Sequence, residues 1–239
     1  MLFLIKHVFF DLGLTLVKNN LPESFHSCIE RAGYTFSLED VKLAYHLANK
    51  EYMKNHPGTL GNKSEDTLTG YLSTIANFLQ GVSLGQPFFK KHLADFRSIS
   101  WVPYPWTFPT LQVLHDQGID IGLISNWDLG CRTVLAETRL DIFLDPIIIS
   151  SEVQIEKPDK RIFEHAIKCK EWKSEECLYV GDNYYDDVLG ATQVGMHSCL
   201  LNFFGAAGIE ELNHPYILSS IQTVPSLIGQ GIFDQDHIV

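Results

Sequence analysis

Five short apolar runs, separated by turns and amphipathic segments, constrain the fold of this chain more than any other feature of its sequence. Apolar strands that alternate with helices predict a mostly parallel sheet with helices on both faces. After Pro158, for example, Ile162, Phe163, Ala166 and Ile167 have the spacing of one buried helix face. We therefore expect an α/β fold of three layers. The predicted strands lie at residues 8–11, 119–125, 147–150, 177–182 and 198–201.

The alternation is interrupted once, because residues 19–100 show helical patterns but no convincing strand. Helical spacing is clearest at 38–54 and 65–79. A proline-rich stretch at 102–109 then resembles a hinge that returns the chain to the strand pattern. We predict that 19–100 is an inserted α-helical domain, which either covers a site or is an ordinary helical lobe. The predicted core, which contains the strands, comprises residues 1–18 and 101–239.

The charge of the chain argues against one class of partner. Its formal net charge is −11, whereas proteins that bind nucleic acids neutralise the phosphates with Lys and Arg. We therefore expect no nucleic-acid partner, and at most a local cationic pocket.

The apolar N-terminus resembles a signal peptide, but Lys6 lies inside the run, Asp11 follows it, and no small-residue cleavage site appears. No other apolar stretch approaches the ~20 residues that span a bilayer. The five cysteines form no C-x-x-C pair, which favours free thiols over a disulfide framework or a zinc site. We therefore expect a cytoplasmic protein with no membrane partner.

Polar side chains stand at the ends of the predicted strands, where open α/β sheets bind their ligands. Asp11 and Asp182 each end a strand, Ser125 ends another, and Lys157 lies in a loop before the next helix. Two carboxylates can hold Mg²⁺, and the cation with a lysine can neutralise a phosphoryl group. A carboxylate among such charges can act as a nucleophile. Each residue alone also has an ordinary structural explanation, such as a helix cap or a surface lysine.

Four motifs stand in order along the chain: DLGLTL at 11–16, SN at 125–126, EKPD at 156–159 and GDNYYDD at 181–187. In this order they resemble the motifs of the haloacid dehalogenase-like superfamily. The resemblance covers residues 8–196, and the helical insertion looks like the C1 cap of that superfamily. It implies a hydrolase with a Rossmann-like core.

The resemblance implies catalytic and substrate-binding roles for four residues. Asp11 would be the nucleophile that forms an aspartyl-phosphate. Ser125 and Lys157 would hold the phosphoryl oxygens, with the backbone of Asn126 nearby.

The resemblance also implies a Mg²⁺ site. Its ligands would be Asp11, the backbone carbonyl of Gly13 and Asp182, while Thr15 would support the loop after the nucleophile. A further carboxylate would act through water. Asp187 fits the spacing of the family better for this role, and Asp186 is the competing candidate.

Gly13 departs from the family pattern, because phosphatases of the family carry an aspartate two residues after the nucleophile. That aspartate protonates the leaving group and then activates water, and such groups contribute ~10²–10⁴-fold in rate. Three interpretations follow. In the first, the chain is a Mg²⁺-dependent phosphatase of a small phosphorylated metabolite, and this enzyme is slow, uses a substrate with a good leaving group or takes its acid from elsewhere. In the second, the chain is a 2-haloacid dehalogenase. In the third, it is a catalytically silent protein that binds a ligand or partner.

The dehalogenase interpretation is the weaker of the two enzymatic ones, because Asp182 is present and position 13 lacks an aromatic residue. A phosphonate-cleaving enzyme with an imine on Lys50 or Lys54 is a minor variant. We predict the phosphatase.

Overall fold

The computed structural model describes residues 5–61 and 64–235. Residues 1–4, which begin the apolar N-terminal run, and residues 62–63 and 236–239 of the predicted domains lie outside the described residues. The chain divides into two units. The larger comprises Met1–Lys18, Val102–Gly205 and Asn213–Val239, and the smaller comprises Asn19–Trp101 and Ala206–Leu212.

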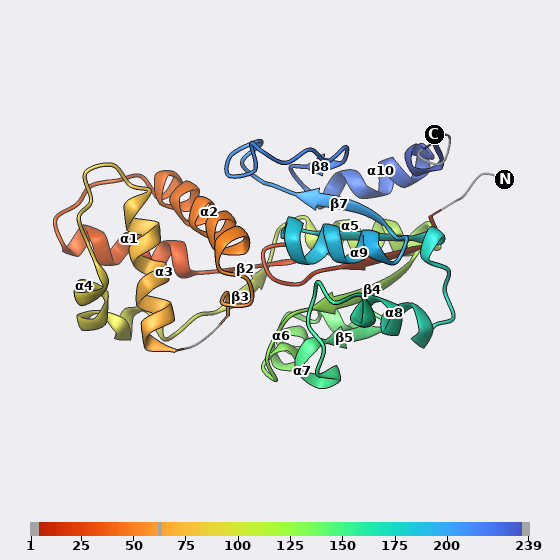
Figure 1. Cartoon of the computed structure of the whole chain (residues 1–239), viewed down its shortest axis with the longest axis horizontal. Helices are drawn as coiled ribbons and strands as arrows, with labels where there is room; N and C mark the ends of the chain where they lie inside the picture. Colours follow the sequence, from red (N-terminus) through yellow and green to blue (C-terminus); the bar gives the residue numbers. More distant parts are fainter. Residues whose placement is uncertain (1–4, 62–63, 236–239) are drawn as a thin grey trace. The chain divides into compact units, whose positions relative to one another are not determined.

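Six parallel strands form the sheet of the larger unit, in the order β5-β4-β1-β6-β7-β8 (Figure 1). The chain moves outward from β1 on one side and then returns to begin again at β6, so the order reverses beside β1. This point is where doubly wound sheets bind their ligands. The strands are β1 (His7–Phe10), β4 (Asp120–Ser125), β5 (Ile147–Ile149), β6 (Cys177–Gly181), β7 (His197–Leu201) and β8 (Ile217–Leu218).

The predicted α/β fold is confirmed, and each of the five apolar runs overlaps a strand of this sheet. All four residues of β1 are buried, because β1 pairs on both edges and both of its faces are covered. Sequence analysis missed β8, since two residues are too short to give a pattern.

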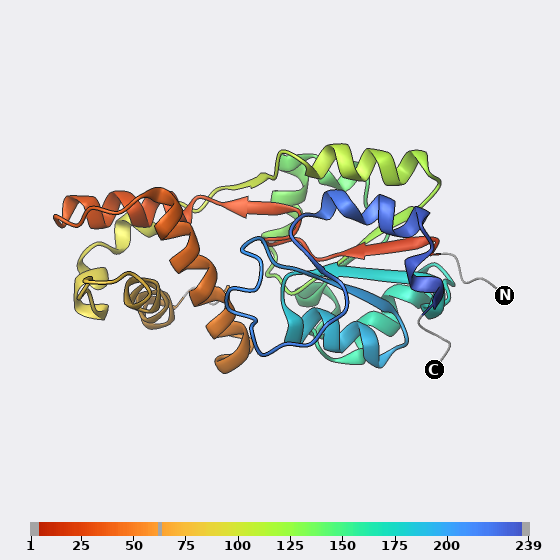
Figure 2. The same cartoon turned by 90° about the horizontal axis from the view of Figure 1, so that it is seen from above.

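Helices cover both faces of the sheet, which gives the expected three layers. In Figure 2, α5 (yellow-green) and α10 (blue) lie on one face, and α8 and α9 (blue-green) lie on the other. The helix predicted after Pro158 is α8, whose Ile162, Phe163 and Ala166 are buried. Asp159 caps it by accepting a hydrogen bond from the Arg161 amide. The helices of this unit are α5 (Thr107–Asp116), α6 (Cys131–Thr138), α7 (Ser150–Val153), α8 (Lys160–Cys169), α9 (Leu189–Gln193) and α10 (Val224–Gly229).

The smaller unit is helical and has its own core, which includes Phe25, Leu72 and Phe89. The helices predicted at 38–54 and 65–79 correspond to α2 and α3, and Ser37 begins α2 with a reciprocal capping box to Asp40. The unit contains α1 (Leu21–Arg31), α2 (Leu38–Asn55), α3 (Glu65–Asn77) and α4 (Gln86–Lys91).

The boundaries of this unit differ from the predicted ones at Trp101, which was assigned to the core, and in one longer segment. Residues 206–212 follow β7 in the sequence, in the range assigned to the core, but they pack with the helices. Two contacts with α2 hold this segment there. Nε2 of His46 lies 3.0 Å from the Ala207 carbonyl oxygen, and Lys54 pairs with Glu211. The two strands β2 (Val17–Asn19) and β3 (Trp101–Pro103) form a separate two-stranded sheet where the chain passes between the units.

Within residues 5–61 and 64–235, no helix is both long and apolar enough to span a membrane.

Candidate functional site

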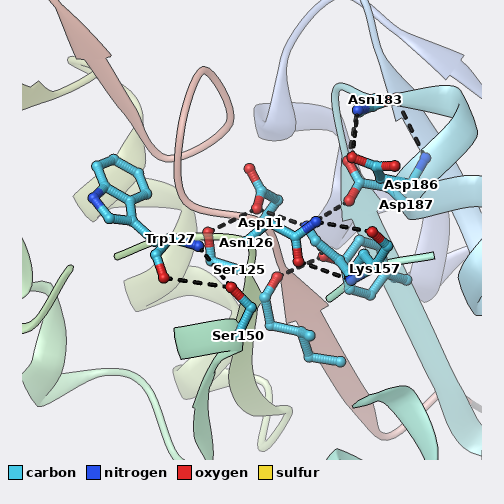
Figure 3. A network of polar contacts seen from close by, with 11 residues as sticks. Asp11, Ser125, Asn126, Trp127, Ser150, Lys157, Asn183, Asp186 and Asp187 are labelled. Carbon is cyan, nitrogen blue, oxygen red and sulfur yellow. Dashed lines mark hydrogen bonds and ion pairs between the residues drawn. The ribbon is translucent and has the colours of Figure 1, made fainter. Parts of the chain in front are cut away.

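Side chains from four separate segments meet at the carboxyl edge of the sheet. Asp11 follows β1, Ser125 ends β4, Lys157 lies in the loop before α8, and Asp187 lies in the π-helical turn η4 (Tyr184–Val188) after β6. Figure 3 shows these side chains pointing toward one another. All four are at most 8% exposed, so the site is nearly free of bulk water. The structure therefore brings together residues that are up to 176 positions apart.

The two oxygens of Asp11 differ in their surroundings. Oδ1 accepts hydrogen bonds from the Ser125 hydroxyl at 3.0 Å and from Lys157 Nζ at 2.8 Å. Among the described residues, no group donates a hydrogen bond to Oδ2. The backbone N–H of Asp11 donates to the Val180 carbonyl at 3.0 Å, which fixes the residue at the end of its strand. One oxygen is thus held in place while the other is available to a ligand.

Lys157 is the centre of the network, because each of its three N–H donors has an acceptor. Its Nζ lies 2.8 Å from Asp11 Oδ1, 2.6 Å from Asp187 Oδ1 and 2.9 Å from the Tyr179 hydroxyl. Burial alone lowers the pKa of a lysine, but the Asp11 and Asp187 carboxylates raise the pKa of Lys157 well above its usual value. The side chain is therefore a buried, fixed positive charge.

Burial raises the pKa of Asp11, and the neighbouring Lys157 charge opposes that increase. A carboxylate that has lost most of its hydration is a stronger nucleophile than one in water. The positive charge of the lysine favours the ionised form of the carboxylate. The site can thus hold the Asp11 carboxylate as a reactive anion next to the Lys157 cation, and this cation can also neutralise an anionic ligand.

Asn126 acts through its side chain on the backbone of Lys157. Its Oδ1 accepts from the Lys157 N–H at 2.8 Å, and its Nδ2 donates to the Lys157 carbonyl at 2.9 Å. Next to it, the Trp127 N–H donates to the Ser150 hydroxyl at 3.1 Å. Sequence analysis assigned Asn126 a role only through its backbone, because residue types alone do not reveal a pair between loops 31 positions apart.

In the segment after β6, the two competing carboxylates, Asp186 and Asp187, have different partners. Both oxygens of Asp187 have donors, because Oδ1 accepts from Lys157 and Oδ2 accepts from the Asn183 N–H at 2.9 Å. Asp186 accepts from Asn183 Nδ2 at 2.8 Å. Burial, with the charge of Asp187, raises the pKa of Asp186 to about 7. Asp187 therefore positions Lys157, whereas Asp186 is the carboxylate that changes its charge near neutral pH.

The remaining predicted residues lie in the loops after β1 and β6. Asp182 directly follows β6 and is 7% exposed. Gly13 lies in a tight turn in which Leu14 has a positive φ of 56°. Thr15 is fully buried, and its hydroxyl has no hydrogen-bond partner in the part of the chain that the structure describes.

No group of three His, Cys, Asp or Glu side chains within residues 5–61 and 64–235 is arranged to hold a metal ion. Mg²⁺ requires fewer side chains, because it usually keeps several waters and takes only one or two carboxylates from the protein. Asp11 and Asp182 follow adjacent parallel strands, and Oδ2 of Asp11 accepts no hydrogen bond from the described residues. The oxygen donors present therefore fit a magnesium ion.

Tyr179 and Asn183 belong to this network, but sequence analysis did not select either as a site residue. Tyr179 stands inside the apolar run of β6 and is fully buried. A hydroxyl in a buried strand needs a partner, which is the one signal that pointed to it.

Comparisons with known proteins show which proteins this chain is similar to. The model of one protein family, described as "Hydrolase: haloacid dehalogenase-like hydrolase", matches residues 5–195. The chain is 30% identical over 202 residues to a glyceraldehyde 3-phosphate phosphatase of Methanopyrus kandleri, covering 81% of this chain and 82% of that protein. It is 35% identical over 159 residues to the rhythmically expressed gene 2 protein of Drosophila melanogaster. That alignment covers 63% of this chain but only 55% of the length of the fly protein.

Solved structures of two kinds of hydrolase share the fold. A HAD phosphatase from Thermococcus onnurineus superposes with a TM-score of 0.57 at 22% identity, covering 94% of this chain and 98% of that one. A dehalogenase superposes with a TM-score of 0.60, also at 22% identity, covering 93% and 96%. At this identity the structures establish a common fold and do not distinguish the two chemistries.

Proposed function

Because this chain belongs to the haloacid dehalogenase-like hydrolase family, we propose that it is a Mg²⁺-dependent phosphatase of a small phosphorylated metabolite. The observation that carries the proposal is the convergence of Asp11, Ser125 and Lys157 at the carboxyl edge of the sheet. The name of the archaeal relative, a glyceraldehyde 3-phosphate phosphatase, supports phosphate release over dehalogenation.

The proposed reaction has two steps. In the first, Oδ2 of Asp11 attacks the phosphorus, the bond to the leaving oxygen breaks, and that oxygen departs with the electron pair. An aspartyl-phosphate remains on Asp11. In the second, water attacks the phosphorus, which releases inorganic phosphate and restores the carboxylate.

Ser125 and Lys157 are the donors for the phosphoryl oxygens in this proposal. Both donate to Oδ1 of Asp11 in the structure. An incoming phosphoryl group therefore shares or replaces these bonds, while Asn126 and Asp187 keep Lys157 in place through its backbone and its ammonium group. Charged donors fixed in a dry site stabilise the charge that develops on the phosphoryl oxygens.

Asp11, Asp182 and the Gly13 carbonyl would hold the Mg²⁺. When bound, the ion supplies positive charge that neutralises the phosphoryl oxygens. Both oxygens of Asp187 already accept hydrogen bonds, one from Lys157 and one from the Asn183 N–H. We therefore assign the role of the carboxylate that acts through water to Asp186, and not to Asp187, which the spacing of the family favours.

Gly13 limits the substrates that this site would hydrolyse quickly. A glycine supplies no acid for the leaving oxygen, so an alkoxide would depart without a proton from that position. We therefore infer slow turnover of alkyl phosphates and faster turnover of substrates whose leaving group is stable as an anion.

The helical unit is, in this proposal, a C1 cap whose side chains select the substrate. Its insertion in the sequence between the first two site segments supports this role. The free thiols of all five cysteines support the cytoplasm as its location.

The test is phosphate release from an aryl phosphate, whose leaving group needs little protonation, with and without Mg²⁺. Asp11→Asn should abolish the release, whereas Asp141→Asn, which changes an exposed aspartate in η2 (Leu140–Ile142), should leave it unchanged. Release that persists in pure Asp11→Asn contradicts the assignment of the nucleophile. If the wild-type protein releases no phosphate, the phosphatase proposal fails, and metal-free halide release from a 2-haloacid tests the dehalogenase.

A further inference from the structure

The hydroxyl of Tyr179 lies between Lys157 and the strand β4. Tyr179 is fully buried in β6, and its ring packs edge-on against Phe163 at 5.4 Å. The hydroxyl lies 2.9 Å from Lys157 Nζ and 2.7 Å from the carbonyl oxygen of Ile124. Ile124 directly precedes Ser125 in β4. One hydroxyl thus connects the lysine to the strand that carries the serine.

The direction of each hydrogen bond is fixed by chemistry. A tyrosine hydroxyl has a single proton, and the Ile124 carbonyl can only accept, so the hydroxyl donates to Ile124. The lysine ammonium can only donate, so the same hydroxyl accepts from Lys157. The ring is fully buried and packs against Phe163, which holds the hydroxyl in place. Tyr179 therefore offers Lys157 an acceptor at one fixed point.

That acceptor completes the set of partners around the ammonium group. Asp11 and Asp187 accept two of its three hydrogen bonds, and Tyr179 accepts the third. With only two acceptors, the ammonium group keeps its charge but can rotate and shift between the two carboxylates. With three, its position and rotation are both determined.

We propose that Tyr179 is a positioning residue, which fixes the ammonium group of Lys157 in the orientation that the reaction needs. The proposal goes beyond the phosphatase assignment and rests on it in one respect, the role of Lys157 as a donor to the phosphoryl group. It predicts that loss of the hydroxyl lowers the rate of the chemical step more than the binding of the substrate.

The first experiment compares wild type with Tyr179→Phe, which removes only the hydroxyl. We expect kcat for the aryl phosphate to fall about tenfold, the equivalent of a weak hydrogen bond to a charged group. KM should change less than about threefold, because the charge of Lys157 remains. Tyr71→Phe is the matched control. Tyr71 is also buried, and its hydroxyl donates to Asn49 at 2.8 Å, so this variant loses a buried hydrogen bond outside the network.

The kinetic outcomes separate positioning from stability. A fall in kcat for Tyr179→Phe, with unchanged kcat for Tyr71→Phe and similar losses of thermal stability, supports the proposal. An unchanged kcat for Tyr179→Phe overturns it. Tighter inhibition by inorganic phosphate with no loss of kcat also overturns it, because the hydroxyl would then compete with the phosphoryl group for the lysine.

The second experiment does not depend on any activity. In protein labelled with ¹⁵N-lysine, an ammonium group with three buried acceptors should exchange its protons slowly and give a resolved ¹H–¹⁵N signal. Lys157→Met identifies the signal by its loss. Tyr179→Phe should shift that signal and accelerate its exchange, while Tyr71→Phe should not. A signal that is missing in wild type or unchanged in Tyr179→Phe overturns the proposal, even if the phosphatase assay has failed.

Discussion

Gly181 allows Asp187 to reach Lys157, and a single methyl group should disrupt that contact. A Cβ atom built on Gly181 would lie 2.1 Å from Oδ2 of Asp187 and 2.4 Å from its Cγ. Ordinary contacts between such atoms begin near ~3.5 Å. The backbone of Gly181 does not have a positive φ, so alanine fits the backbone itself. The three atoms nearest to that Cβ all belong to the Asp187 side chain, so in Gly181→Ala this side chain must move by more than ~1 Å.

The movement breaks two contacts of Asp187. One is the ion pair with Lys157 at 2.6 Å, and the other is the hydrogen bond from the Asn183 N–H at 2.9 Å. Breaking a buried ion pair costs about 3–5 kcal/mol. Lys157 keeps Asp11 and Tyr179 as partners, so we expect a loss of about 3 kcal/mol in the free energy of unfolding. For a chain of this size that is a fall in Tm of roughly 6–12 °C.

Urea unfolding of four variants, Gly181→Ala, Gly229→Ala, Asp187→Ala and the double variant of positions 181 and 187, tests this reasoning. Gly229 in α10 has nothing within 4 Å of a built Cβ, so Gly229→Ala is the matched control, with an expected gain of about 0.5–1 kcal/mol. In a background of Asp187→Ala, which removes the obstructing carboxylate, Gly181→Ala should cost much less than in wild type. The reasoning is refuted if Gly181→Ala unfolds at the wild-type urea concentration, or if the two substitutions are additive.

Two further predictions concern the acid–base groups of the site. Gly13→Asp should raise kcat for an alkyl phosphate by about 10²-fold, and much less for an aryl phosphate, because only the alkoxide needs a proton; the backbone φ of Gly13 is not positive, so a side chain is compatible with it. An unchanged ratio of the two rates in the folded variant contradicts the role of this position. Asp186 has a pKa of about 7 in the fold, above its unfolded value, so its protonated form stabilises the metal-free protein at low pH and that stability is lost as the pH rises through 7. Asp186→Asn in EDTA should therefore stabilise the protein at pH 8 by about 4 kcal/mol relative to pH 4. Equal effects in urea unfolding at the two pH values would disprove this.

Local patterns in the sequence determine the secondary structure and the strand ends. The run before Asp11 is buried on both faces, and such a run is continuous in apolar residues because no side of the strand meets water. The same holds for the run before Asp182. The spacing after Pro158 gives α8 and its buried face, because a helix places every third or fourth residue on one side.

Pairs between side chains on different strands are decided only by the register and packing of the folded chain. The sequence does not place the hydroxyl of Tyr179 against Lys157, or the amide of Asn126 against the backbone of the same lysine. It also does not separate Asp186 from Asp187, since one step along a helical turn directs a side chain to a different neighbour. The assignment of residues 206–212 to the helical unit depends likewise on contacts with α2 that are about 160 positions away in the sequence.

The sequence by itself therefore determined the three-layer α/β fold and the residue types at the edge of its sheet, because periodicity and strand ends are local properties. Only the tertiary structure decided which of those residues touch. The reason is physical: Asp11, Lys157 and Asp187 form a buried charge network whose partners are selected by distances of less than 3 Å, and those distances exist only after β1, β4 and β6 have paired.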